Sequence, residues 1–149
     1  MKYYILLPVG FILFSIACRN TPPPTPAKKV GFNELPEDFR NFYQKFHTDS
    51  AYQMAHISWP LRGETAVQSD STYPERRLKA WEPADWQVQH LVDLTTGEFR
   101  GEWEITGNTF VLERIKYAAA TYGVERHFFK RDDGEWELMY YADMQDLGQ

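Results

Sequence analysis

His47 and Asp49 are the two side chains whose types and spacing best suit catalysis. A histidine and a carboxylate two residues apart can share a hydrogen bond, and such a pair can perform general acid–base chemistry when it faces a pocket. Tyr43 and His56 lie close by in the sequence and are further candidates for proton transfer. Structural roles are also open, because Asp49 can cap a following helix and His47 can lie at the C-terminal end of a preceding one.

Metal-binding and cofactor-binding motifs are absent from the sequence. No two of the four histidines have the i, i+4 spacing that places two metal ligands on one helix face: His47, His56, His90 and His127. The chain also lacks a G-x-S-x-G nucleophile elbow, a P-loop and a G-x-G-x-x-G turn. We therefore expect no metal and no cofactor.

A group of tryptophans forms the second candidate site. Trp59, Trp81 and Trp86 cluster around a predicted strand pair and the segment after it, and Arg62 lies nearby. Pockets for small molecules combine aromatic walls with a few polar groups, so these residues are candidates for the mouth of a ligand site. Core packing is the alternative, because each tryptophan buries roughly 150–250 Å² of surface.

Composition limits the class of protein and its partners. The chain has 149 residues, enough for one domain, and its content of 43% hydrophobic and 16% aromatic residues rules out wholesale disorder. Its formal net charge of −5 opposes binding to nucleic acid. The partners to expect are a membrane, a small-molecule ligand or another protein.

The N-terminal segment predicts a lipid anchor. Lys2 is followed by an apolar stretch over residues 3–16, by Ala17 and by Cys18, the only cysteine. This layout resembles a bacterial lipoprotein signal peptide with its lipobox, in which Ser15 replaces the usual leucine. The resemblance implies cleavage before Cys18, lipid attachment to its sulfur and acylation of the new amine, as with palmitate. The alternatives are a secreted protein with a spare cysteine and an uncleaved membrane anchor, for which a spanning helix needs about 20 apolar residues.

These features divide the chain into three parts. Residues 1–17 are predicted to be the signal peptide, and residues 18–31 a lipidated cysteine with a Pro-rich tether. Four prolines over residues 20–29 preclude a helix and disfavour a sheet. By analogy with lipoprotein sorting, Arg19 favours the outer membrane of a bacterial cell envelope, with the protein on its periplasmic face. Residues 32–149 are predicted to form a single α+β domain.

The candidate catalytic residues lie on the first predicted helices of this domain. Helical spacing of apolar residues predicts a helix over about residues 36–47: Leu35, Phe39, Phe42, Tyr43 and Phe46. Asp49 or Ser50 can cap a short second helix that ends at Ala55.

The candidate tryptophans lie on the elements that follow. Ile57, Trp59 and Leu61 alternate with polar residues and predict a strand that Pro60 restricts to a sheet edge or a bulge. Residues 63–74 are loop-like, and residues 76–81 are a possible partner strand. Residues 83–92 fit a third helix or an alternating strand. We prefer the helix because Pro83 and Asp85 suit its first turn.

From residue 96 the pattern predicts a four-stranded antiparallel meander. Trp103 and Ile105 alternate with glutamates, and strands follow over residues 110–117 and 122–131. Turn signals at residues 106–108 and 132–134 separate the strands, and the last strand runs through Trp136, Leu138 and Tyr140. Short connections make successive strands antiparallel neighbours.

This order of elements over about residues 35–143 resembles the NTF2-like, or cystatin-like, α+β cone. The resemblance implies an α+β fold with N-terminal helices packed on a curved, mainly antiparallel sheet. Residues 39–63, Trp81 with Trp86, and residues 134–138 are also similar to a family of uncharacterised bacterial lipoproteins with a domain of unknown function.

We therefore expect a membrane-anchored envelope lipoprotein whose domain binds a ligand or a protein. The alternatives are a small cone-pocket enzyme, an isomerase or hydrolase that uses His47, Asp49 or Tyr43, and a structural subunit of envelope assembly.

Overall fold

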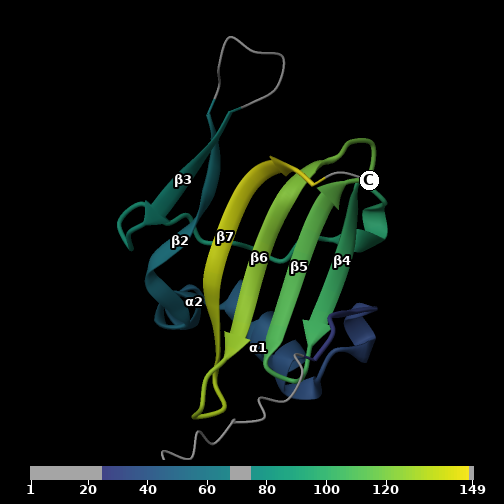
Figure 1. Ribbon diagram of the computed structural model, residues 1–149, viewed down its shortest axis with the longest axis vertical. Helices are drawn as coiled ribbons and strands as arrows, with labels where there is room; N and C mark the ends of the chain where they lie inside the picture. Colours follow the sequence, from purple (N-terminus) through teal and green to yellow (C-terminus); the bar gives the residue numbers. More distant parts are fainter. Residues whose placement is uncertain (1–24, 68–74, 148–149) are drawn as a thin grey trace, which may run out of the picture.

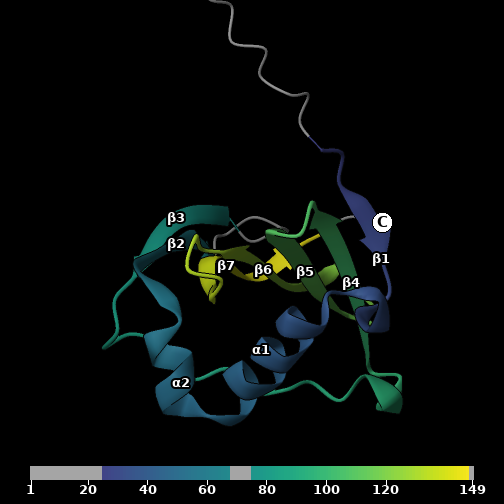
Figure 2. The ribbon, with the colours of Figure 1, turned by 90° about the horizontal axis from the view of Figure 1, so that it is seen from below.

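The computed structural model describes residues 25–67 and 75–147, where two helices lie on one face of a curved seven-stranded sheet (Figure 1, Figure 2). The helices are α1 (Glu37–Thr48) and α2 (Ser50–Ala55). The strands are β1 (Lys28–Val30), β2 (Ile57–Val67), β3 (Glu75–Trp81), β4 (Phe99–Thr106), β5 (Phe110–Tyr117), β6 (Tyr122–Lys130) and β7 (Trp136–Asp146). Two short 3-10 helices are η1 (Phe32–Glu34) and η2 (Leu94–Thr96). Within the described ranges no helix is both long enough and apolar enough to cross a membrane.

The sheet has the strand order β1-β4-β5-β6-β7-β2-β3 (Figure 1). All neighbouring strands are antiparallel except β2 and β7, which pair in parallel. Strands β4 to β7 form the predicted meander, with each strand hydrogen-bonded to the next in the chain. The predicted α+β class, with N-terminal helices on a curved and mainly antiparallel sheet, is confirmed.

The core lies between α1 and the inner face of the sheet. Phe39 and Phe46 are fully buried on α1, and Phe39 makes an edge-to-face contact with Trp136 of β7 at 4.9 Å between ring centroids. Trp103 of β4 and Phe128 of β6 are buried on the same side. The helical spacing that predicts α1 is therefore the spacing that fills the core. Asp49 caps α2 as predicted, because its carboxylate accepts a hydrogen bond from the backbone N–H of Tyr52 at 2.9 Å.

Two boundaries differ from those predicted. Lys28–Val30, expected in the tether, forms the edge strand β1, in which Val30 pairs with Trp103 of β4. Strand β2 extends to Val67 instead of ending near Leu61, and β3 pairs with it up to that residue. Pro60 lies within β2, where the register to β7 shifts between Ile57 and Arg62, so the predicted bulge is confirmed. The alternative of an edge strand is wrong, because β2 lies between β7 and β3.

The predicted third helix is wrong. Residues 83–92 form a turn and an irregular segment that crosses the helix-covered side of the sheet from β3 to η2 (Figure 2). Four strands lie between β3 and β4, which corresponds to about 24 Å of sheet. Ten helical residues would span only about 15 Å, whereas an irregular chain reaches further.

Candidate functional site

A buried polar cluster lies inside the cone between α1 and the sheet. Glu113 of β5 and Arg126 of β6 are register partners, and Glu113 Oε2 accepts a hydrogen bond from Arg126 Nη1 at 2.8 Å. The other carboxylate oxygen, Oε1, accepts a hydrogen bond from the Tyr43 hydroxyl of α1. All three residues are at most 5% exposed. Tyr43, one of the candidate catalytic residues, thus has its hydroxyl engaged by a buried carboxylate.

The cluster fixes the charge states of its members. Burial, together with the negative charge of Glu113, raises the pKa of Tyr43 well above its usual value. Burial, the largest single effect, disfavours the charge of Arg126, but the surrounding groups, with Glu113 foremost, together raise the arginine pKa. A neutral Tyr43 and a Glu113–Arg126 ion pair give a cluster with no net charge.

Gln53 of α2 ties the irregular segment to the helices. This fully buried side chain donates through Nε2 to the backbone carbonyls of Phe46 and Gln89, at 2.7 and 2.8 Å. Its Oε1 accepts from Trp86 Nε1 at 2.9 Å and from the backbone N–H of Gln89 at 2.8 Å. Gln89 Oε1 in turn accepts from Arg126 Nη2 at 3.1 Å. The polar cluster and the irregular segment therefore form one connected network.

His47 and Asp49 do not form the predicted pair. His47 is buried and its Nδ1 lies 2.9 Å from the backbone carbonyl oxygen of Tyr43, whereas Asp49 is exposed and its carboxylate caps α2. Burial lowers the pKa of His47 to about 4, with the positive charge of Arg126 as the second cause. Although His47 and Asp49 are only two residues apart, the junction between α1 and α2 turns one side chain into the core and the other towards solvent. His56 stacks on Tyr52, with 3.7 Å between ring centroids.

The three candidate tryptophans lie close together, but mainly as packing residues. Trp81 and Trp86 are buried, and each makes an edge-to-face contact with Tyr141 at 5.1 Å. Trp59 is half-buried and donates to the backbone carbonyl of Met54 at 3.0 Å. Trp81 and Trp86 do border a small polar pocket of about 180 Å³. Arg62 is exposed on β2, and strand alternation places it on the face opposite buried Leu61.

A pocket larger than this polar one opens beside the cone, and Trp59, Trp81 and Trp86 are not part of its lining. It has a volume of about 520 Å³, and most of its lining is apolar: Phe32, Leu91, Val92, Leu94, Trp103 and Ile115. Tyr43, Asp93 and Thr95 complete the lining. The pocket is therefore built by η1, α1, η2 with the segment before it, and the inner face of β4 and β5.

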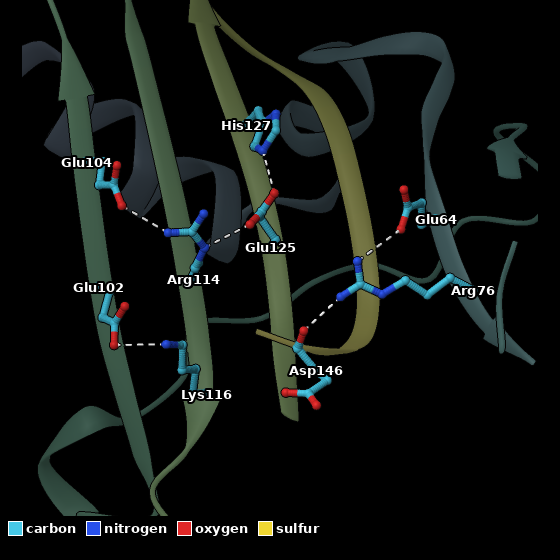
Figure 3. Close-up of polar contacts among 9 residues, drawn as sticks. All are labelled: Glu64, Arg76, Glu102, Glu104, Arg114, Lys116, Glu125, His127 and Asp146. Carbon is cyan, nitrogen blue, oxygen red and sulfur yellow. Dashed lines mark hydrogen bonds and ion pairs between the residues drawn. The ribbon is translucent and has the colours of Figure 1, made fainter. Parts of the chain in front are cut away.

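The opposite face of the sheet carries a separate set of ion pairs (Figure 3). Arg114 of β5 bridges Glu104 and Glu125, with nitrogen–oxygen distances of 2.9 and 2.8 Å. Lys116 contacts Glu102 at 3.1 Å. The residues of this network retain partial exposure, so its charges are better solvated than those of the buried pair. The described residues contain no group of three or more His, Cys, Asp or Glu side chains placed to bind a metal ion.

Tyr43 is the only sequence-based candidate that belongs to the buried cluster or to the pocket lining. Glu113 and Arg126 occupy inward positions of β5 and β6, since Val111, Ile115 and Phe128 on the same strands are buried. A charged residue in the inward phase of each of two adjacent strands is a sequence signal for such a pair. The pocket residues Leu91 and Val92 lay within the wrongly predicted helix, where they were assigned to its apolar face.

Comparison with known proteins shows the fold. No protein-family model and no curated protein matches the chain. One similar solved structure is an NTF2-like protein from Bacteroides fragilis NCTC 9343, with 21% identity and a TM-score of 0.51 over 74% of this chain and 48% of the other. Another is a cystatin-like protein from Bacteroides caccae ATCC 43185, with 18% identity and a TM-score of 0.50 over 74% of this chain and 78% of the other.

The chain spans about half the length of the first of these proteins. At these identities the likeness concerns the arrangement of helices and strands. The described part of the chain therefore has the NTF2-like, or cystatin-like, α+β fold.

Proposed function

We propose that this protein is a lipid-anchored lipoprotein of the bacterial cell envelope whose domain binds a small ligand in the pocket beside α1. The observation that carries the ligand site is the pocket of about 520 Å³ with its mostly apolar lining. Small-molecule sites typically measure about 300–1,000 Å³ and share this apolar character. The cone beside it is filled by buried aromatic residues of α1 and the sheet, so a ligand on this side of the sheet would lie in the pocket and not inside the cone.

Binding is favoured over catalysis by the polar groups at the pocket. The Tyr43 hydroxyl donates to Glu113, and Asp93 accepts from the Thr95 backbone N–H at 2.8 Å as it caps η2. These groups already have structural partners. Among the residues that the structure describes along this pocket, no histidine–carboxylate pair is positioned for acid–base chemistry.

The ligand site is tested with an uncharged fluorescent probe, N-phenyl-1-naphthylamine. The protein used is the chain from residue 18 onward with Cys18→Ser, which removes the lipid but keeps every described residue. We expect saturable fluorescence enhancement that Leu91→Trp abolishes, because Leu91 is half exposed at the pocket and a larger ring there fills it. Lack of probe binding by a folded protein would overturn the proposed ligand site.

The anchor is proposed from residues 1–18, whose layout resembles a lipoprotein signal apart from Ser15. Lipid chains at Cys18 would hold the protein on the membrane, because each buried methylene contributes about 0.8 kcal/mol. The test is labelling of bacterial cells with a palmitate analogue, followed by fractionation. We expect label and outer-membrane association for the unaltered protein and neither for Cys18→Ser. Unchanged labelling of Cys18→Ser would refute lipidation at this residue.

A further inference from the structure

The charges at the pocket indicate which kind of ligand it accepts. Among its described lining residues the only ionisable side chains are Tyr43 and Asp93, and neither is a cation. Tyr43 is neutral because burial raises its pKa. Hydrogen bonds from Thr95 lower the pKa of Asp93, so this side chain is an anion at neutral pH. The fixed charge along the pocket lining is therefore negative.

The nearest buried cation is already neutralised. Arg126 lies deeper in the cone, where Nη1 bonds Glu113 at 2.8 Å and Nη2 bonds Gln89 at 3.1 Å. An anionic ligand drawn to Arg126 would compete with Glu113 for the same guanidinium, and displacing Glu113 would leave a buried carboxylate without its counter-ion. The ion pair thus does not offer a positive charge to the pocket.

The hydroxyl groups of the lining are likewise engaged, and the one buried polar atom of the described lining without a partner is the uncharged indole nitrogen of Trp103. The Tyr43 hydroxyl donates to Glu113, and the Thr95 hydroxyl donates to Asp93 at 2.6 Å. A ligand headgroup would therefore find few free hydrogen-bond partners among the described lining side chains, while its apolar body would meet Phe32, Leu94 and Ile115. Removing a charge from water without a partner is costly, whereas an apolar body gains from burial.

We infer that the pocket selects an uncharged, mainly apolar ligand and discriminates against anionic amphiphiles such as fatty acids. This inference rests on the proposed ligand site and adds the chemical class of its occupant. It follows from the engaged Tyr43, the anionic Asp93 and the neutralised Arg126.

Two fluorescent probes with the same ring system test this selectivity. N-phenyl-1-naphthylamine is uncharged, and 8-anilino-1-naphthalenesulfonate adds one sulfonate to the same aromatic body. Both are titrated at fixed salt and neutral pH into the chain from residue 18 with Cys18→Ser. We expect the sulfonate to bind at least about tenfold more weakly than the uncharged probe.

Charge variants at Asp93 and Leu91, two exposed residues at the rim of the pocket, test whether the pocket itself discriminates between the two probes. Asp93→Asn keeps an oxygen that can cap η2, and we expect it to strengthen sulfonate binding about two- to threefold without changing the uncharged probe. Leu91→Lys adds a cation at the rim and is expected to act in the same direction. Asp85→Asn is the matched control, because it makes the same charge change at an exposed residue that borders the other pocket.

The possible outcomes separate the two proposals. Equal or tighter binding of the sulfonate, abolished by Leu91→Trp, would overturn the charge selectivity and leave the ligand site standing. Binding of neither probe to a protein with an unchanged melting temperature would overturn the ligand site itself. Equal effects of Asp93→Asn and Asp85→Asn would show that net charge, and not the pocket rim, sets the preference.

Discussion

Glu113 and Arg126 face each other directly across β5 and β6, with 2.8 Å between Glu113 Oε2 and Arg126 Nη1 and almost no exposure of either side chain. Arg114, one position after Glu113, points to the opposite face and pairs with Glu104 and Glu125 in a partly exposed network. The same strand thus carries two kinds of ion pair, one on each face. Because the two kinds of pair differ in solvation, we expect their loss to change the free energy of unfolding by different amounts.

We predict that Arg126→Met lowers the free energy of unfolding by about 3–5 kcal/mol, because it leaves Glu113 buried without a counter-ion. Arg114→Met is the matched control on the outer face and should cost about 1 kcal/mol or less. Urea unfolding of both variants measures the difference. Equal losses would show that burial does not distinguish the two networks.

Replacing Glu113 as well as Arg126 tests whether the unpaired charge causes the loss of stability. In the double variant Glu113→Leu with Arg126→Met, no buried charge remains unpaired. We expect it to be more stable than Arg126→Met alone, since replacing both members of a buried pair by apolar residues is often close to neutral. A double variant less stable than the single one would mean that losing the hydrogen bond from Tyr43 to Glu113 costs more than removing the unpaired charge gains.

The predictable part of this fold is the part with clear periodicity. Phe39, Phe42, Tyr43 and Phe46 share one face of α1, and all four are buried as their spacing predicts. Trp103 and Trp136 alternate with glutamates and lie on the buried face of the sheet. Local patterns sufficed here because each element buries one regular face.

The unpredictable part depends on contacts between distant segments. Residues 83–92 fit both helical and alternating patterns, and the distance between β3 and β4 decides against the helix. The hydrogen bonds of Gln53 to Gln89 replace those that a helix would supply. The pocket depends on the same tertiary arrangement, since η1 and the segment before η2 meet β4 only in the folded chain.

His47 should give the protein a characteristic loss of stability in mild acid. Its pKa falls from the ordinary histidine value of 6.5 to about 4 in the fold, so the unfolded chain binds more protons between these pH values. The stabilisation is complete above about pH 6.5, decreases as the pH falls, and levels off near pH 4. The expected decrease is roughly 3 kcal/mol, measured as the free energy of unfolding against pH.

The control for this prediction is His47→Gln, which removes the titrating ring. Asp38 and Glu125 also have lowered pKa values, but in the unfolded chain their carboxyl groups take up protons mainly below about pH 5, whereas His47 does so from about pH 6.5. A His47→Gln protein that kept the full slope between pH 6.5 and 5 would assign the effect to other groups.

Gly63 should tolerate no larger side chain, because β2 passes close to β7 at this residue. A Cβ atom there would lie 1.6 Å from the carbonyl oxygen of Tyr141 and 2.8 Å from the ring of Trp81. We expect Gly63→Ala to lower the free energy of unfolding by about 3 kcal/mol or more. Gly97→Ala is the comparison, since its Cβ meets no atom within 4 Å but its φ is +78°, for which we expect a loss of roughly 1 kcal/mol. Comparable losses in chemical denaturation would argue against a close contact at Gly63.

Gln53 should control both the stability of the domain and the shape of the ligand pocket. Gln53→Leu removes four hydrogen bonds at once and leaves the indole N–H of Trp86 and the backbone of Gln89 without these partners. Unsatisfied buried groups cost about 1–3 kcal/mol each, so we expect a loss of at least about 3 kcal/mol. Gln44→Leu, at an exposed position on α1, is the matched control and should change stability by less than about 0.5 kcal/mol.

The effect of Gln53→Leu should extend to the pocket because Gln89 lies only two residues before Leu91, the first pocket residue of that segment. Without the bonds to Gln53, the backbone of residues 86–93 is held less firmly, and its amide hydrogens should exchange faster with solvent. Affinity for N-phenyl-1-naphthylamine should fall at the same time, under conditions in which the variant is still folded. Faster exchange with unchanged probe affinity would mean that the pocket does not depend on this segment, and the ligand would then contact mainly η1 and the sheet.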